Sequence, residues 1–181
     1  MLAGCHTHQT MDRLTIDGPW FLDAAGRHVL LRGVNLGGSS KTPAWPAGAT
    51  HVPQDVASHR DVSFVGRPMP LEAVDEHLRR FRRWGFRVVR LLVTWEAVEH
   101  AGPGIHDEAY LDYIAEVARR AGEHDLYVFI DPHQDAWSRW SGGDGAPGWT
   151  LEAVGFDLSR RTIRLRPGSR SSRLALPALA T

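Results

Sequence analysis

Hydrophobic and polar positions alternate along the chain in blocks that predict strands and helices in turn. Residues 14–36 contain two short apolar runs around a Gly-containing turn, which predicts a β-hairpin that leads into an extended run from Val29 to Val34. The stretch from Pro70 to Gly85 carries apolar residues at three- and four-residue spacing. That spacing predicts an amphipathic helix, and its arginine run, "RRFRR", then falls on the solvated face.

Two near-continuous apolar runs, "FRVVRLLVTW" and "LYVFI", predict buried strands, and "DEAYLDYIAEVARRAG" between them predicts a second helix that ends at Gly122. Buried strands that alternate with amphipathic helices are typical of a parallel sheet, hence of an α/β fold of barrel or doubly wound type. Chemistry in such folds gathers at the carboxyl ends of the strands. Polar clusters follow three of the predicted strands: Asn35 to Lys41, Thr94 to Glu96, and Asp131 to Asp135.

The remaining stretches lack such patterns. Residues 37–70 are rich in Gly, Pro, Ser and His without a clear period, which predicts a long loop. From Leu158 to Thr181 there is no acidic residue, while arginine recurs among Ser, Pro and Leu, so a disordered or non-native basic tail is predicted. We therefore expect a disordered N-terminus over 1–13, one folded domain over 14–158, and a disordered tail over 159–181.

Composition excludes some classes of partner. The 21 Lys and Arg balance the 21 Asp and Glu, so nothing favours nucleic acid or an anionic membrane surface, and a neutral partner fits better. The single cysteine, Cys5, cannot form an internal disulfide, and the first residues lack the apolar region of a signal peptide. No run approaches the ~20 apolar residues of a spanning helix. We expect a cytoplasmic protein without stable membrane insertion.

Three residues at the predicted strand ends are candidates for chemistry. Arg90 lies inside "VVRLLV", where a buried guanidinium needs either a core carboxylate or a role in orienting catalytic groups or substrate. His133 and Asp135 have a spacing that metal ligands use, but most other histidines lie in the hairpin, the loop or the first helix, so no metal is expected. The two side chains can instead grip hydroxyls of a neutral polyol, or only cap the next element.

Tryptophans and glycines fill the segment that follows. Trp137, Trp140 and Trp149 lie in a Gly-rich loop, where aromatic faces can stack on a pyranose, contact a lipid-like aglycone, or simply pack the loop. The stretch "RGVNLGGSSK" lacks both glycine patterns that bind nucleotide phosphates. No cofactor is therefore expected.

Three blocks, "LLRGVNLGGSSK", "GFRVVRLLVTWEAVEHAGPGIHDEAYLDYI" and "YVFIDPHQDAWSRWSGGDGAPGWT", closely resemble glycoside hydrolase family 5. They are similar to its branch of endoglycoceramidases and fungal glucosylceramide and steryl glucoside β-glucosidases, over roughly residues 14–158. The resemblance implies a (β/α)8 TIM barrel, of which this chain would carry the N-terminal portion, about three of eight strands, after a short β-hairpin. It also implies a retaining mechanism with two glutamates about 5 to 5.5 Å apart.

The resemblance also implies roles for individual residues. Arg90 looks like the arginine of the second strand that hydrogen-bonds the nucleophile, and His133 like the sugar-binding histidine of the third. Lys41 and Asp135 look like residues that hold glucose hydroxyls, while Asp131 fits a supporting role. With Trp137 and Trp149 as stacking residues, this set implies a β-glucoside or glycolipid substrate.

One departure from the family limits what the chain can do. Its single asparagine, Asn35, is followed by Leu36, so the Asn-Glu pair that carries the acid/base is absent, and no nucleophile is recognised. The resemblance stops near "GFDLSR", where a frameshift, mis-splicing or truncation would explain the change. We expect an inactive fragment of a glycolipid β-glucosidase. The alternatives are an inactive carbohydrate- or glycolipid-binding remnant and a metal-dependent barrel hydrolase; the aglycone and the oligomeric state stay open.

Overall fold

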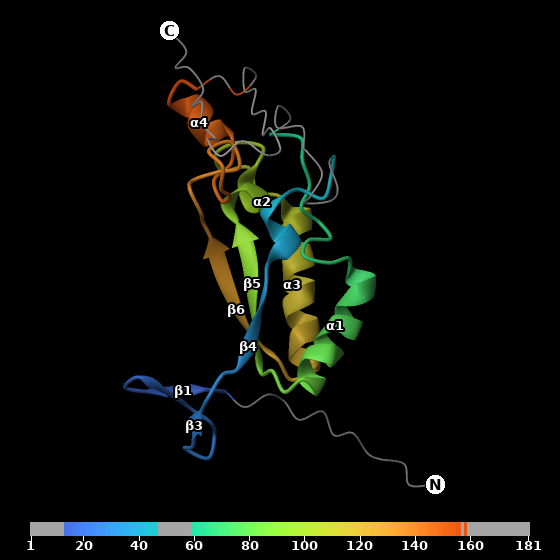
Figure 1. Cartoon of the computed structure of the whole chain (residues 1–181), viewed down its shortest axis with the longest axis vertical. Coiled ribbons are helices and arrows are strands. Elements are labelled where there is room, and N and C mark those ends of the chain that lie inside the picture. Colours follow the sequence, from blue (N-terminus) through green and yellow to red (C-terminus); the bar gives the residue numbers. More distant parts are fainter. Residues whose placement is uncertain (1–12, 47–58, 157, 159–181) are drawn as a thin grey trace, which may run out of the picture.

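A three-stranded parallel sheet forms the centre of the structure, a computed structural model that describes residues 13–46, 59–156 and 158 (Figure 1). Its strands are β4 (Gly33–Leu36), β5 (Val88–Thr94) and β6 (Tyr127–His133), in the order β4-β5-β6. The three predicted parallel strands are thus confirmed. The predicted disordered tail over 159–181 and the N-terminus, apart from Arg13, lie outside the described residues.

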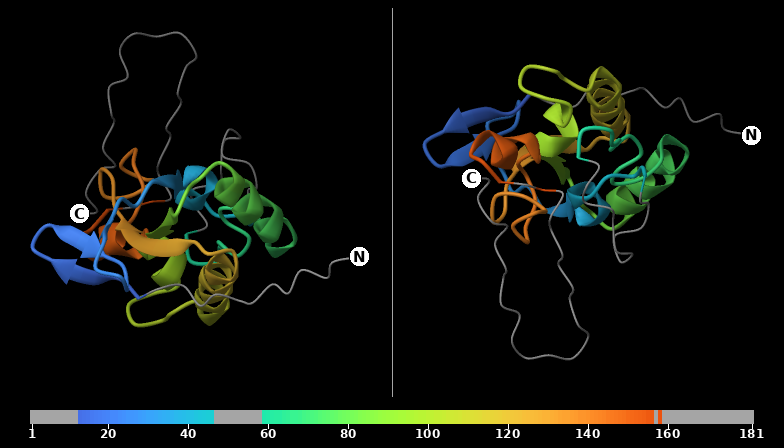
Figure 2. Two further views of the ribbon diagram at one scale, coloured as in Figure 1. Left: turned by 90° about the horizontal axis from the view of Figure 1, so that it is seen from below. Right: turned by 90° about the horizontal axis from the view of Figure 1, so that it is seen from above.

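Two helices cover one face of this sheet, α1 (Leu71–Arg83) and α3 (Glu108–Glu123) (Figures 1 and 2). Their apolar stripes pack against the β5 side chains that point to the same face, Val89 and Leu91. The tyrosine hydroxyl of Tyr113 donates a hydrogen bond of 2.6 Å to the carbonyl of Met69 and ties α3 to the segment before α1. The core therefore lies between the sheet and the helices, as the alternating pattern predicts.

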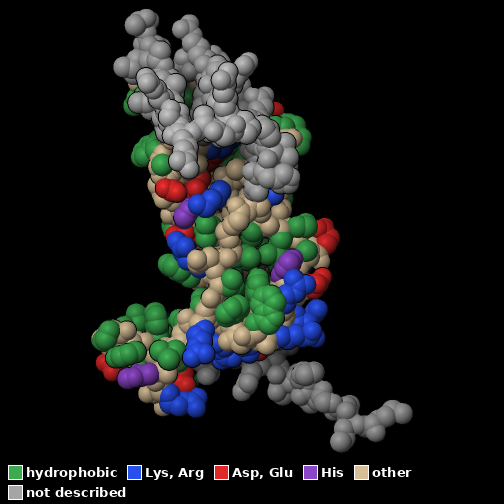
Figure 3. Space-filling model, viewed as in Figure 1, with side chains coloured by type: hydrophobic (Ala, Val, Ile, Leu, Met, Phe, Trp, Pro, Cys, Tyr) green, Lys and Arg blue, Asp and Glu red, His purple; other side chains and the backbone are tan. Residues whose placement is uncertain are grey.

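The arginines of α1 gather toward its C-terminal end (Figure 3). Arg80 pairs with Glu76 on the same helix, and Arg82 lies 3.7 Å from Asp125. Arg79 and Arg83 are exposed. The prediction that this run occupies a solvated face is confirmed.

A separate antiparallel sheet precedes β4 and projects from the end of the molecule where β4 begins (Figure 1). It contains β1 (Thr15–Asp17), β2 (Trp20–Leu22) and β3 (His28–Val29). The predicted hairpin is confirmed, but the continuous run from Val29 to Val34 is wrong, since the chain turns between β3 and β4. The Arg32 amide donates to the Leu30 carbonyl at 3.1 Å and closes a tight turn. The spacing of apolar residues in the sequence does not predict this turn.

Helix ends also differ from expectation. The second predicted helix does not end at Gly122, which lies inside α3 without a positive φ; the helix continues to Glu123, and Asp125 takes the left-handed conformation (φ 54°). Three short helices were not predicted, because elements of four or five residues carry too few positions for a period. They are η1 (Gly38–Lys41), α2 (Trp95–Glu99) and α4 (Trp149–Ala153).

Candidate functional site

The alternation of side chains along the strands separates a polar face of the sheet from the helix-covered face. Asn35, Arg90 and Phe129 are register partners across β4, β5 and β6, and Thr94 is the partner of His133. Asp131 and His133 follow Phe129 at two-residue steps, so they share its face. This polar face points away from α1 and α3.

Arg90 finds its partner on the neighbouring strand. Its guanidinium lies 2.7 Å from the Asp131 carboxylate. The same carboxylate oxygen lies 3.0 Å from Nδ1 of His133, which donates to it because an ionised carboxylate can only accept. Arg90 therefore has a carboxylate partner, and Asp131 supports both Arg90 and His133.

Asp144 extends this row on the other side of His133. One of its carboxylate oxygens lies 3.0 Å from Nζ of Lys41, at the end of η1, and the other lies 3.5 Å from Nε2 of His133. Asp144 is buried. The structure thus brings the side chains of five residues into one row: Arg90, Asp131, His133, Asp144 and Lys41. Sequence reasoning did not single out Asp144, although an acidic residue between glycines in "SGGDGAP" was a usable signal.

The loop after β6 folds back so that Asp135 and Asp144 form an antiparallel bridge. Their main chains exchange two hydrogen bonds, of 2.9 and 2.8 Å. The Asp135 side chain is exposed, beside the row rather than within it. Glycine is required next to Asp144, because a Cβ on Gly143 would lie 1.8 Å from the Asp135 carbonyl oxygen and Gly145 has a φ of +124°.

The predicted tryptophans separate into two groups. Trp137 and Trp149 each meet Trp95 edge to face, at centroid distances of 6.4 and 5.5 Å, and Trp137 stays about half exposed (49%). Trp140 instead is buried, with the Arg139 guanidinium 4.2 Å from its ring centroid. Trp95, which was not predicted, completes the exposed aromatic cluster at the carboxyl end of β5.

A buried ion pair between Arg139 and Glu96 fixes the loop after β6 to the start of α2. The Arg139 Nε lies 2.9 Å from both carboxylate oxygens of Glu96, and the Glu96 amide donates to the Gly145 carbonyl at 2.6 Å. Burial raises the pKa of Glu96, while the Arg139 charge opposes that shift. Both carboxylate oxygens of Glu96 are bound by Arg139, so Glu96 does not join the row of side chains from Arg90 to Lys41.

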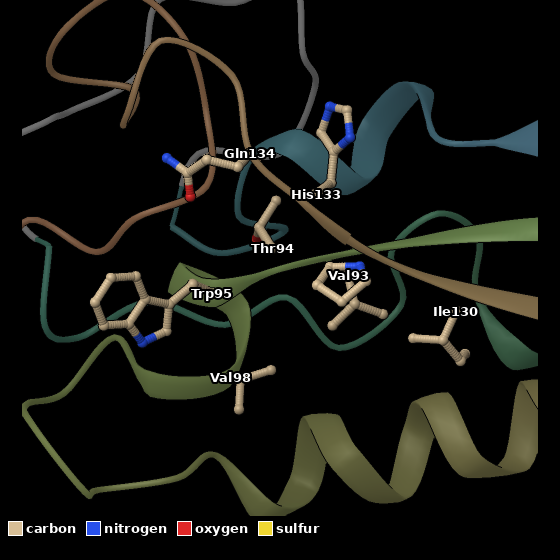
Figure 4. A pocket seen from close by; sticks show the side chains of 8 residues that line it. Val93, Thr94, Trp95, Val98, Ile130, His133 and Gln134 are labelled. Atoms are coloured by element: carbon tan, nitrogen blue, oxygen red, sulfur yellow. The ribbon is translucent and has the colours of Figure 1, made fainter.

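An apolar pocket of about 370 Å³ lies beside the site rather than in it (Figure 4). Val93 and Ile130 line it on the side of the sheet that faces α3; His133 also borders it, although its side chain points the other way. Outer strand faces of a (β/α)8 barrel are covered by helices, and the pocket lies on such a face.

The part of the chain that the structure describes has neither a cluster of metal ligands nor a membrane-spanning helix. There, no three His, Cys, Asp or Glu side chains form a group that could hold a metal ion. Asp131 and Asp144 lie at opposite nitrogens of the His133 ring, so they do not converge on one point. Within the same described residues, every helix is too short or too polar to traverse a bilayer.

Comparison with known proteins identifies the family of this chain. The family model described as Cellulase (glycosyl hydrolase family 5) matches residues 41–152, a stretch that contains the three ion pairs made by Lys41, Arg90 and Arg139 and the loop after β6. The chain belongs to glycosyl hydrolase family 5. The family predicted from the three sequence blocks is thereby confirmed, and family membership implies a TIM barrel.

Relatives within family 5 share most of the described chain. A glucosylceramidase of Rhizopus delemar is 51% identical over 144 residues, which are 78% of this chain and 21% of the relative. An ergosteryl-beta-glucosidase of Saccharomyces cerevisiae is 44% identical and covers 79% of this chain and 19% of its own length. The crystal structure of Cryptococcus neoformans sterylglucosidase 1 with tris superposes with a TM-score of 0.71 at 44% identity, over 77% of this chain and 20% of that chain. The chain spans about a fifth of the length of these relatives.

Proposed function

We propose that this chain holds the glucose of a glycolipid β-glucoside, such as glucosylceramide or steryl glucoside, within a retaining β-glucosidase site. One observation carries the proposal: Lys41 and His133 both contact the carboxylate of Asp144 at the carboxyl end of the sheet. Asp135 lies next to them, because its main chain pairs with that of Asp144. The names of the relatives, which refer to glucosylceramide and steryl glucosides, support the substrate class.

The chemistry of the row suits a neutral sugar. Lys41 offers ammonium donors and Asp135 offers carboxylate acceptors, the two kinds of group that a sugar hydroxyl engages at once. The side chain of Lys41 is 38% exposed, so its remaining donors can reach a ligand. Trp137 adds an exposed aromatic face two residues after Asp135 in the same loop, suited to the C–H face of a pyranose.

Arg90 takes a supporting role in this proposal. Its pairing with Asp131 fixes the guanidinium on the polar face of the sheet, where it is 36% exposed. In the family, the arginine at this place hydrogen-bonds the nucleophile. Asp131 would therefore orient both Arg90 toward the reacting carboxylate and His133 toward the sugar.

The chain of 181 residues does not carry the groups that break the bond. Double displacement requires an acid/base and a nucleophile, and the sequence holds no Asn-Glu pair. Glu96 cannot replace them, since Arg139 binds both of its oxygens in the interior. We expect binding of the glucoside by this polypeptide without hydrolysis, so catalysis belongs to a protein that supplies both glutamates.

Two measurements on the purified polypeptide test the proposal. Saturation-transfer NMR with methyl β-D-glucoside is expected to show binding that the His133→Ala variant loses, while hydrolysis of 4-nitrophenyl β-D-glucoside stays at the uncatalysed rate. Absence of binding in the unchanged protein would contradict the substrate assignment. Enzyme-like turnover that His133→Ala abolishes would contradict the assignment of both missing glutamates.

A second candidate is a glycolipid-binding protein without enzymatic function, which the same arrangement of Lys41, His133 and Asp144 would serve. The two candidates differ in what restores activity. Adding back a polypeptide that carries the remaining family 5 strands and both glutamates is expected to yield hydrolysis under the first. If such a complex assembles but the chain still binds glucosylceramide without turnover, the second is favoured. A cytoplasmic location stays a prediction of the sequence.

A further inference from the structure

Asp144 is the shared partner of two candidate sugar-holding residues that come from different elements. Its carboxylate spans Lys41 at 3.0 Å and His133 at 3.5 Å, and its side chain is only 6% exposed. A carboxylate in such an environment is costly unless a cation compensates it. Lys41 supplies that cation, so the position of the Lys41 ammonium is tied to the position of Asp144.

The backbone around Asp144 is built to hold this carboxylate in place. Two hydrogen bonds to Asp135 fix the main chain of Asp144. A side chain at Gly143 would collide with the Asp135 carbonyl, and one at Gly145 would meet Gln134 at 2.4 Å in a backbone conformation that disfavours it. Asp144 therefore has little freedom to follow Lys41 or His133, and they must adjust to it.

His133 is constrained from both ring nitrogens. Nδ1 donates to Asp131 at 3.0 Å, whereas Nε2 is buried and faces Asp144 at 3.5 Å without a hydrogen bond. Nε2 therefore lies against the carboxylate whose other oxygen binds the Lys41 ammonium. The three side chains on this side of the row therefore form one electrostatic unit.

We infer that Asp144 is a positioning residue, which sets the Lys41 ammonium and the His133 ring in the geometry that holds the glucoside. The inference rests on the proposed function and deepens it, because it assigns the pre-organisation of the sugar grip to a residue that contacts no sugar in this scheme. Removing the Asp144 charge frees Lys41 and changes the electrostatic surroundings of Nε2 of His133, while the fold of the sheet stays intact.

The test compares Asp144→Asn with a matched control, Asp125→Asn. Both variants replace an ion-paired aspartate by its isosteric amide, but Asp125 pairs with Arg82 at the opposite end of the sheet. In ¹⁵N-labelled protein, Asp144→Asn is expected to shift the imidazole nitrogens of His133 and to abolish slow exchange of the Lys41 ammonium protons. Affinity for methyl β-D-glucoside is expected to fall about tenfold or more; Asp125→Asn changes none of the three.

The readouts separate the inference from the proposed function. If the unchanged protein binds no methyl β-D-glucoside, the proposed function fails, and the His133 and Lys41 signals still decide the role of Asp144. If Asp144→Asn leaves those signals and the affinity as they were, the inference is overturned.

A second variant covers the case in which Asp144→Asn folds but is too unstable for the NMR comparison. The double variant Lys41→Met with Asp144→Asn removes both charges, so it is expected to unfold at a higher urea concentration than Asp144→Asn alone. Equal midpoints for the single and the double variants would show that Lys41 and Asp144 are not coupled, which overturns the inference.

Discussion

The guanidinium of Arg139 clasps the carboxylate of Glu96, with Nε 2.9 Å from both oxygens, and so joins the loop after β6 to the start of α2. Both side chains are almost fully buried, at 7% and 2% exposure. The contact places a loop without regular structure against the end of β5. The stability of the whole site therefore depends on a pair of residues that face away from it.

Glu96→Gln is expected to lower the free energy of unfolding by about 3 kcal/mol, because it removes the charge that compensates a buried guanidinium. Urea denaturation followed by far-UV circular dichroism measures this change. The control is Glu123→Gln, which breaks a surface pair with Arg119 on α3 and should cost less than about 0.5 kcal/mol. Equal effects of the two variants would contradict the buried role of the pair.

Gly143→Ala is expected to destabilise the protein by about 2 kcal/mol or more, because the new methyl group would overlap the Asp135 carbonyl oxygen at 1.8 Å. Gly122→Ala is the matched change at an unhindered site inside α3, where nothing lies within 4 Å. It should stabilise by about 0.5 to 1 kcal/mol, since alanine favours the helix. Thermal unfolding of both variants gives the comparison, and a neutral Gly143→Ala would refute the tight approach.

Acid is expected to remove a contribution from the surface of α3. The side-chain hydrogen bond from Arg119 lowers the pKa of Glu116 from 4.5 to about 2. A lowered folded-state pKa stabilises the fold above pH 4.5, and this contribution disappears as pH falls toward 2. The difference in unfolding midpoint between the unchanged protein and Glu116→Gln should therefore shrink over that range. A difference that stays constant from pH 6 to pH 2 would speak against this ion pair.

Trp137→Ala is expected to weaken binding of methyl β-D-glucoside or of short-chain glucosylceramide several-fold, because it removes an exposed aromatic face from the loop that carries Asp135 and Asp144. Trp84→Ala is the control, since Trp84 is also exposed but lies at the end of α1 away from the site. Saturation-transfer NMR with each ligand distinguishes two roles of Trp137. Weaker binding of both ligands indicates contact with the sugar, and weaker binding of glucosylceramide alone indicates contact with the aglycone. Unchanged binding of both ligands would assign Trp137 to packing of the loop.

Much of the scaffold could be predicted from local pattern. The period of the α1 and α3 stripes and the apolar runs of β5 and β6 reflect burial between layers, which repeats along the chain. The break at Arg32 and the continuation of α3 past Gly122 could not be predicted, because they depend on single hydrogen bonds and backbone angles. Propensity at Gly122 favoured a stop, and the helix ends one residue later, at Glu123.

The candidate site was predicted in part. Arg90 lies within one predicted strand, and Asp131 and His133 stand at the end of the next, so the pairing of these strands predicts that the three side chains are neighbours. Asp144 was missed because its place depends on the loop folding back onto Asp135, a tertiary contact that no period encodes. Glu96 was grouped with a polar cluster at a strand end, but only the structure shows that Arg139 turns it inward.

Gly143 and Gly145, which flank Asp144, limit the substitutions that the gene can accept in this loop. Nearly every replacement at Gly143 or Gly145 breaks the backbone path, and replacement of Asp144 leaves Lys41 without its counter-charge. Most positions on the exposed face of α1 accept substitution freely by comparison. In a copy of the gene released from selection, substitutions at these three adjacent codons are no longer removed, so their state reports whether the loop is still maintained.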